Sequence, residues 1–183
     1  MFLTDGNRKL EKDGIVSFDI TPGKSCPWAG ACNKEGWGYC HKLIRLYPAY
    51  AAKVERNRKL TLCGAKTLLL AVGPEIEKHK GGFIRLHGVG DFYSQRYLDN
   101  WAKVFRAFPK KQFYAYSKSL CLDFPKRNFT LIKSWGGKLD RLIKSSDRQA
   151  LVVPKQGPIP RGFVESKSDL WWLNHSKYAM KKH

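Results

Sequence analysis

The sequence predicts an α/β fold whose βα units form a mainly parallel sheet, arranged as an open partial barrel with a short C-terminal extension. Short apolar runs typical of strands recur along the chain, and segments with apolar residues at helical spacing separate the earlier ones. This recurrence of strand, loop, helix and strand indicates parallel pairing. Right-handed crossovers would curl such units into a partial barrel or, alternatively, a doubly wound sheet.

The first half of the chain is expected to contain one strand and two helices. Residues 1–14 are polar and form a lead-in. Residues 15–20 alternate apolar and polar positions, which favours a strand, and turn-forming residues end it. Apolar residues recur at helical spacing over 43–60, and a second helix over 61–78 is bent or interrupted at Gly73-Pro74.

The following stretch repeats the pattern with shorter connections. Residues 83–87 indicate a short buried strand. Ser94 is a good N-cap for a clearly amphipathic helix that ends near residue 108. Further strands are expected at 112–117, 128–133 and 149–153, with a short helix at 138–144.

The C-terminal part differs in composition. Residues 157–162 are rich in proline and glycine, which predicts a surface loop. Residues 169–183 mix aromatic and basic side chains, so they form a terminal helix or cover nucleic acid. Because 183 residues with 43% hydrophobic content suffice for one core, we expect a single domain over 1–183. Its lead-in is 1–14, its α/β core 15–153 and its C-terminal segment 154–183.

The charge of the chain predicts a polyanionic partner. Lysine and arginine number 34 against 15 acidic residues, which gives a net charge of +19. A basic protein of this kind is expected to bind nucleic acid, either DNA or RNA, although the charge could also serve solubility alone. No long basic amphipathic helix points to a membrane surface. The expected phosphate contacts are Arg45, Lys53, Arg56, Arg58, Lys59, Lys110, Lys111, Lys126 and Arg127.

The sequence also predicts where the protein resides. The N-terminus turns polar too soon for a signal peptide, and no window approaches 18 uninterrupted apolar residues. A cytoplasmic protein is expected, and in that reducing compartment clustered cysteines favour metal binding over disulfides.

Three of the five cysteines lie in one glycine-rich loop. Cys26, Cys32 and Cys40 follow the pattern C-x5-C-x7-C, and His41 comes directly after. Three soft thiolates so close in sequence predict an iron–sulfur cluster, and zinc with a Cys3His set is the alternative. The cysteines could also simply be buried apolar residues. Possible fourth ligands are His41, Cys63 and Cys121, although Cys63 is expected to belong to the core.

Further unusual residues follow the ends of predicted strands, where ligands bind in parallel sheets. His87, Asp91 and Lys118 are the catalytic candidates. The alternative is that Asp91 closes a turn or caps a helix, and that His87 is a buried histidine hydrogen-bonded within the core. The residues expected to bind a cofactor are Gly88, Gly90, Asp91, Ser117 and Lys118.

Three blocks of sequence resemble the bacteriophage gene-product-eighty-eight family. They are Ser17-Phe18-Asp19 with Cys26-Pro27, Gly30 and Cys32; Arg85-Leu86-His87 with residues 90–94; and residues 113–119. The resemblance covers roughly residues 15 to 135 and implies a phage protein acting in the host cell cytoplasm.

The layout of these blocks is in turn similar to radical S-adenosylmethionine proteins. That resemblance implies a 4Fe–4S cluster on Cys26, Cys32 and Cys40, with Gly90 and Asp91 near a bound S-adenosylmethionine. The expected function is therefore a radical enzyme-like iron–sulfur protein that acts on or binds nucleic acid. The alternative is a non-enzymatic protein that binds nucleic acid or interferes with a host protein, and that holds a structural zinc or cluster.

Overall fold

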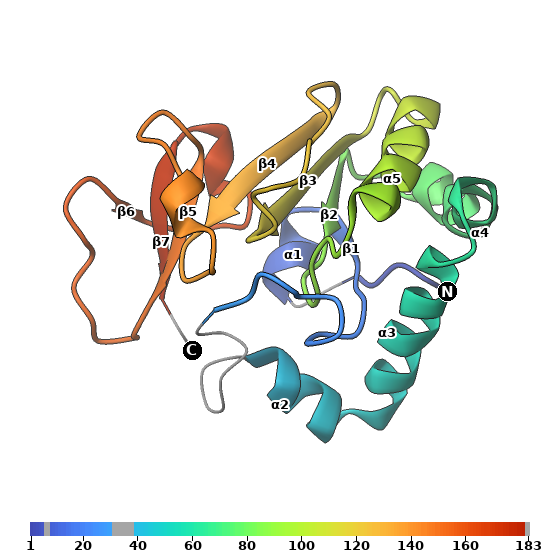
Figure 1. The fold of residues 1–183 in the computed structure, drawn as a ribbon, viewed down its shortest axis with the longest axis horizontal. Coiled ribbons are helices and arrows are strands. Elements are labelled where there is room, and N and C mark those ends of the chain that lie inside the picture. Colours follow the sequence, from blue (N-terminus) through green and yellow to red (C-terminus); the bar gives the residue numbers. More distant parts are fainter. Residues whose placement is uncertain (6–7, 31–38, 182–183) are drawn as a thin grey trace.

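A computed structural model describes residues 1–5, 8–30 and 39–181 of the chain. Up to β3, one or more α-helices separate each short strand from the next, and the later connections contain no α-helix (Figure 1). In chain order they are α1 (Arg8–Lys12), β1 (Ile15–Phe18), α2 (Tyr39–Leu46), α3 (Pro48–Thr61), α4 (Ala65–Lys78), β2 (Phe83–Leu86), α5 (Gln95–Ala107), β3 (Gln112–Ser117), β4 (Phe129–Ser134), the 3₁₀ turn η2 (Asp140–Leu142), β5 (Gln149–Val153), β6 (Val164–Glu165), the 3₁₀ turn η3 (Trp171–Leu173) and β7 (Lys177–Lys181).

The strands form one open sheet, which confirms the predicted α/β fold. Its order is β1-β2-β3-β4-β5-β7-β6, and each neighbouring pair is parallel. The order follows the chain from β1 to β5, whereas a doubly wound sheet reverses its order. Because the strands run in the same direction, the turns that follow β1, β2, β3 and β4 come together at one edge, which we call the carboxyl edge.

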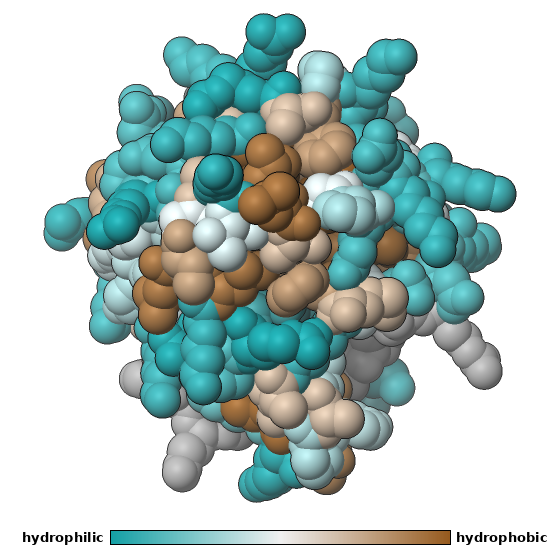
Figure 2. All heavy atoms as spheres, turned by 90° about the vertical axis from the view of Figure 1, so that its right-hand side faces the viewer, coloured by the Kyte–Doolittle hydropathy of each residue, from teal (hydrophilic) through white to brown (hydrophobic). Residues whose placement is uncertain are grey.

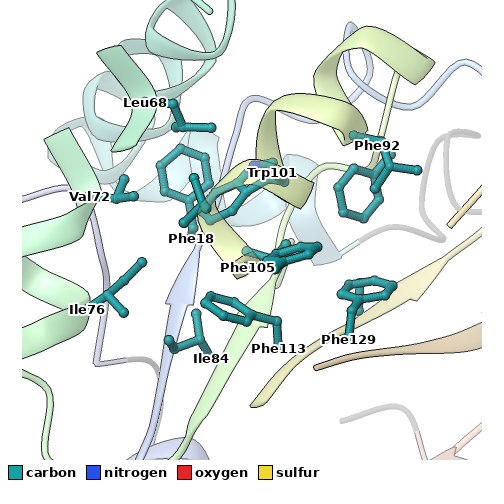
Figure 3. Packing of buried hydrophobic residues seen from close by; sticks show 14 of the residues in the cluster. Phe18, Leu68, Val72, Ile76, Ile84, Phe92, Trp101, Phe105, Phe113 and Phe129 are labelled. Carbon is teal, nitrogen blue, oxygen red and sulfur yellow. The ribbon is translucent and has the colours of Figure 1, made fainter. Parts of the chain in front are cut away.

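The main core lies between the β1–β4 part of the sheet and helices α4 and α5 (Figures 1 and 3). Phe18 of β1 meets Trp101 of α5 edge-on, with ring centroids 5.0 Å apart. A second cluster on the opposite face joins Tyr114 and Tyr116 of β3 to Trp172 and Tyr178. Apolar residues therefore cover both faces of the central strands, as is usual for parallel sheets. Figure 3 shows the main core through Phe18, Leu68, Val72, Ile76, Ile84, Phe92, Trp101, Phe105, Phe113 and Phe129.

The helices differ from prediction at a proline. The helix expected over 43–60 is divided into α2 and α3, because Pro48 opens α3 and disfavours helical backbone at Tyr47 before it. Cys63 lies between α3 and α4 and is exposed, so its predicted core role is wrong. The face seen in Figure 2 is largely hydrophilic around a central apolar area. Leu62, which follows α3, and Leu70 of α4 are exposed. In the described ranges, no helix has the length and apolar character needed to cross a membrane.

The C-terminal segment departs most from prediction. The terminal helix considered for 169–183 is wrong, because β7 enters the sheet between β5 and β6. Tyr178 and Ala179 of β7 are fully buried, whereas the flanking Lys177 and Met180 are only partly covered. The short helix expected over 138–144 is limited to the turn η2. Residues 154–181 thus complete the sheet with two strands.

Candidate functional site

The described ends of the cysteine loop both rest on the turn that follows β2. At Gly90, which has a φ of +94°, an added Cβ would lie 3.0 Å from Ser25 Oγ. The Tyr39 hydroxyl donates a hydrogen bond to the carbonyl of Gly88. Cys26 follows Ser25 and Cys40 follows Tyr39, so each cysteine is the sequence neighbour of a residue that meets this turn at the carboxyl edge.

The stretch after Cys26 continues along this edge to β4. Ala29 pairs with Gly137 in an antiparallel bridge, and the backbone N–H of Lys138 donates to the carbonyl of Trp28 at 3.0 Å. Gly30 approaches Gly136 so closely that a Cβ would fall 2.3 Å from the Gly136 carbonyl oxygen. The loop that starts after β1 is therefore fixed across the ends of the central strands.

The metal ligands predicted in this loop are only partly described. Cys26 and Cys40 are half-buried, and Cys32 lies outside the described residues. Within residues 1–5, 8–30 and 39–181, no three His, Cys, Asp or Glu side chains gather in a way that could hold a metal ion. His41, Cys63 and Cys121 are exposed.

Asp19 connects three elements beneath the loop. Its carboxylate accepts hydrogen bonds from the Ser17 hydroxyl at 3.0 Å, the Tyr50 hydroxyl at 2.8 Å and the Val89 N–H at 3.1 Å. Burial next to this carboxylate raises the pKa of Tyr50. A Cβ on Gly88 would lie 2.8 Å from Asp19 Oδ1, which explains the glycine at that position. Asp19 was absent from the predicted site, although its place directly after β1 was a usable signal.

Asp91 and Lys118 connect neighbouring strand ends. The Asp91 carboxylate accepts hydrogen bonds from the Ser117 hydroxyl at 2.6 Å and from the N–H groups of Phe92 and Lys118 at 2.7 and 2.9 Å. Burial raises the pKa of Asp91, and these hydrogen bonds oppose that shift. The Lys118 ammonium donates to Ser134 Oγ at 2.6 Å and to the Trp135 carbonyl at 2.8 Å. These contacts fit the alternative in which Asp91 closes a turn.

His87 belongs to the core under α5. Its Nε2 is 2.8 Å from the Tyr97 hydroxyl, and its ring meets Phe92 edge-on at 4.4 Å. Its backbone has a φ of +64°, which is uncommon outside glycine. Burial, reinforced by the nearby Arg85 charge, lowers the pKa of His87 to about 3. The imidazole is consequently neutral near pH 7.

A buried ionic cluster on the opposite sheet face was missed by sequence reasoning. Arg85 of β2 forms an ion pair with Asp169 at 2.8 Å, and its guanidinium lies 4.8 Å from the Tyr116 ring centroid. The Tyr114 hydroxyl also donates to the Asp169 carboxylate, and the Tyr116 hydroxyl donates to the Asp169 backbone carbonyl. Arg85 and Asp169 are 84 positions apart, so no local pattern links them.

The nine predicted phosphate contacts divide into two kinds. Lys53, Arg58 and Lys111 bind neighbouring groups of the fold, such as the Leu3 carbonyl, the Glu55 carboxylate and the Gly81 carbonyl respectively. Arg56 is exposed but donates to the Met1 carbonyl at 2.6 Å. The other five are exposed and form no ion pair with another described residue: Arg45, Lys59, Lys110, Lys126 and Arg127.

Comparisons with known proteins identify the family. The Gene product 88 family matches residues 1–179. The chain is also similar to the Gene 88 protein of Mycobacterium phage D29, with 30% identity over 123 residues, which cover 62% of this chain and 50% of that protein. It thus spans about half the length of this relative. No solved structure matches the chain. The match over nearly the whole sequence places the chain in the phage Gene product 88 family.

Proposed function

We propose that this protein carries an iron–sulfur cluster, or alternatively zinc, on Cys26, Cys32 and Cys40 at the carboxyl edge. The observation that carries the proposal is the support of both ends of the cysteine loop by the Gly88–Gly90 turn. Ser25 and Tyr39, the residues that precede Cys26 and Cys40, both meet this turn, so one loop could bring the three thiolates together. Carboxyl edges of parallel sheets are common ligand sites.

The chemistry of the donors suits a thiophilic group. Three cysteine thiolates satisfy three irons of a 4Fe–4S cluster or three positions of zinc. A bound cluster would supply one-electron chemistry, and an iron without a protein ligand could bind S-adenosylmethionine. The Gly88–Gly90 backbone and Asp91 would then be the residues that hold the bound molecule. The radical enzyme-like activity rests on this layout, since the family match itself names no reaction.

Cysteine variants test the metal proposal. Protein purified without oxygen is expected to contain iron and sulfide, or zinc, and Cys26→Ser, Cys32→Ser and Cys40→Ser should each lose it. Cys63→Ser and Cys121→Ser are the matched controls, because both thiols are exposed outside the loop. Equal metal content in all five variants would overturn the assignment. Cleavage of S-adenosylmethionine by the reduced protein tests the catalytic part separately.

Binding to nucleic acid is a second proposed function, with or without catalysis, in the host cytoplasm. The net charge of the chain is +19. Asp19, Asp91 and Asp169 are buried, so the surface exposes fewer carboxylates than the 15 acidic residues of the sequence. Affinity for single-stranded DNA or RNA should fall steeply as salt rises, because Lys and Arg release counterions from phosphates. No binding, or binding that is independent of salt, would contradict this function. Salt-independent capture of a host protein would instead favour host interference.

A further inference from the structure

A cavity lies at the amino ends of β5 and β7, on the edge of the sheet opposite the carboxyl edge. It is lined by Ser146 and Arg148, which precede β5, and by residues 172–176, which precede β7. A hydrogen bond of 2.6 Å from the Gln149 N–H to the Ser176 carbonyl joins the two segments. The volume of the cavity is about 390 Å³. Pockets that hold small-molecule ligands usually measure about 300–1,000 Å³, so this cavity is large enough for such a ligand.

The lining of the cavity carries a positive charge. Arg148 is exposed, and no acidic side chain is among the described residues that line the cavity. Asp147, the neighbour of Arg148 in sequence, forms an ion pair of 2.8 Å with Lys133 and accepts from the Lys144 N–H at 2.6 Å. Arg148 forms no ion pair with another described residue, and its Nε donates to the Trp172 carbonyl at 3.4 Å. The charge of Arg148 is therefore available to an anionic ligand.

An aromatic stack adjoins the cavity. The rings of Trp171 and His175 are parallel within 2°, and their centroids lie 4.4 Å apart. His175 Nδ1 is also 3.2 Å from the Trp171 carbonyl, which helps to fix the imidazole. Because Trp171 covers one face of the ring, an occupant of the cavity that His175 lines can meet only the other face or the ring edge. Fixed aromatic rings of this kind are platforms on which nucleic-acid bases stack.

Trp172 adds a buried donor that the fold does not satisfy. This residue lines the cavity and is only 3% exposed, and its indole Nε1 has no hydrogen-bond partner among the described residues. Buried polar atoms are nearly always paired, so an unpaired donor in a residue of the cavity wall points to a ligand with acceptor atoms. The Asn174 amide and the hydroxyls of Ser146 and Ser176 can both donate to and accept from the polar edge of such a ligand.

We propose that this cavity binds one nucleotide, with the base against His175 and the phosphate at Arg148. A nucleotide combines a planar ring, polar edge atoms and an anionic phosphate, and the cavity offers a partner for each. A free nucleotide and a nucleotide within a single strand present this same chemistry. For a nucleotide within a strand, the inference deepens the proposed binding of nucleic acid and rests on it. It is independent of the metal centre, which lies at the carboxyl edge.

Titration of the full chain with adenosine monophosphate, followed by NMR, tests the cavity. Saturable shifts are expected for the Trp172 indole N–H and the Asn174 side-chain NH2. Inorganic phosphate should not reproduce them, because it has no ring to stack. His175→Ala should weaken binding about tenfold, a typical loss for one stacked base. Arg148→Gln should weaken it by a similar factor, because a charge-assisted hydrogen bond to the phosphate is lost.

Arg161→Gln is the matched control for Arg148→Gln. Arg161 is exposed in the loop that follows β5, at the other end of that strand, and its variant removes the same charge. Its affinity for adenosine monophosphate should equal that of the unmodified chain. Absence of saturable shifts, or equal weakening by Arg148→Gln and Arg161→Gln, would overturn the proposal. Because Arg148 is exposed, its variant remains a valid test if His175→Ala disturbs the fold.

A single-stranded oligonucleotide of adenosines distinguishes the two sources of the nucleotide. If it moves the Trp172 and Asn174 signals and adenosine monophosphate displaces it, the cavity holds a nucleotide of the strand. If only the mononucleotide moves them, the cavity binds the free nucleotide. An oligonucleotide that binds while neither probe moves these signals would overturn the site in the cavity and leave nucleic-acid binding in place. An oligonucleotide that does not bind at all would contradict nucleic-acid binding, and the mononucleotide titration would still decide the cavity.

Discussion

Arg85 and Asp169 form an ion pair of 2.8 Å that joins β2 to the segment before η3. Their side chains are only 15% and 8% exposed. The Tyr114 hydroxyl also donates to the Asp169 carboxylate, and the Tyr116 hydroxyl donates to the Asp169 backbone carbonyl. The last part of the chain is thereby fixed against the centre of the sheet.

Loss of this ion pair should strongly destabilise the protein. Arg85→Met leaves Asp169 buried without its cation, which typically costs about 3–5 kcal/mol. Urea denaturation measures the free energy of unfolding. Glu165→Gln is the control, because the Lys181–Glu165 pair is longer and more exposed and is expected to contribute about 0–1 kcal/mol. Similar losses for the two variants would show that the buried pair is not important for stability.

Asp91→Asn separates a structural role from a catalytic one. The variant keeps the size of the side chain but weakens the acceptor that joins Phe92, Ser117 and Lys118. We expect a loss of about 1–3 kcal/mol of unfolding free energy. Asp99→Asn on the exposed face of α5 should change stability by less than about 0.5 kcal/mol. An unchanged stability with loss of cofactor or nucleic-acid binding would instead make Asp91 a binding residue.

His87 should make the fold sensitive to acid. Its pKa is lowered from 6.5 to about 3, so below pH 6.5 the unfolded chain binds a proton that the folded chain does not. The contribution of neutral His87 to the free energy of unfolding is fully present above pH 6.5. It decreases as the pH falls towards 3, by at most about 1.4 kcal/mol per pH unit. His87→Asn tolerates the positive φ and should flatten the dependence of unfolding free energy on pH between 4 and 6.5. Identical pH profiles would refute this.

Lys118 and Lys126 are expected to differ in role. Lys118→Met removes the ammonium bound to Ser134 and Trp135, which should cost about 1.5–3 kcal/mol of stability. Lys126 is exposed, so Lys126→Met should leave stability within about 0.5 kcal/mol. If Lys126 contacts a phosphate, its variant should reduce the salt slope of nucleic-acid binding by about one. The reverse pattern would make Lys118 the phosphate contact.

Much of the fold was predictable because its signals are local. The strands at 83–86, 112–117 and 149–153 follow apolar runs, and α5 follows its Ser94 cap. Strand β7 was not predicted, because its segment mixes aromatic and basic residues and its pairing partner β5 precedes it by a long connection. Parallel pairing depends on such distant contacts, which sequence patterns do not reveal.

The candidate site was predicted in position but not in its contacts. Residues after parallel strands must meet at one edge, so Asp91 and Lys118 were expected near the cysteine loop. That Asp91 binds Ser117, and Lys118 binds Ser134, depends on side-chain geometry across neighbouring strands. The role of Asp19 under Gly88 likewise appears only when β1 and β2 are placed side by side.

The most direct test of the metal centre is chemical analysis of the full chain purified without oxygen. We expect a coloured protein with iron and acid-labile sulfide in equal amounts, about four of each per chain for a 4Fe–4S cluster. Zinc without sulfide would support the alternative metal at the same cysteines. Protein that is colourless and contains neither iron, sulfide nor zinc would contradict the claim that Cys26, Cys32 and Cys40 bind a metal.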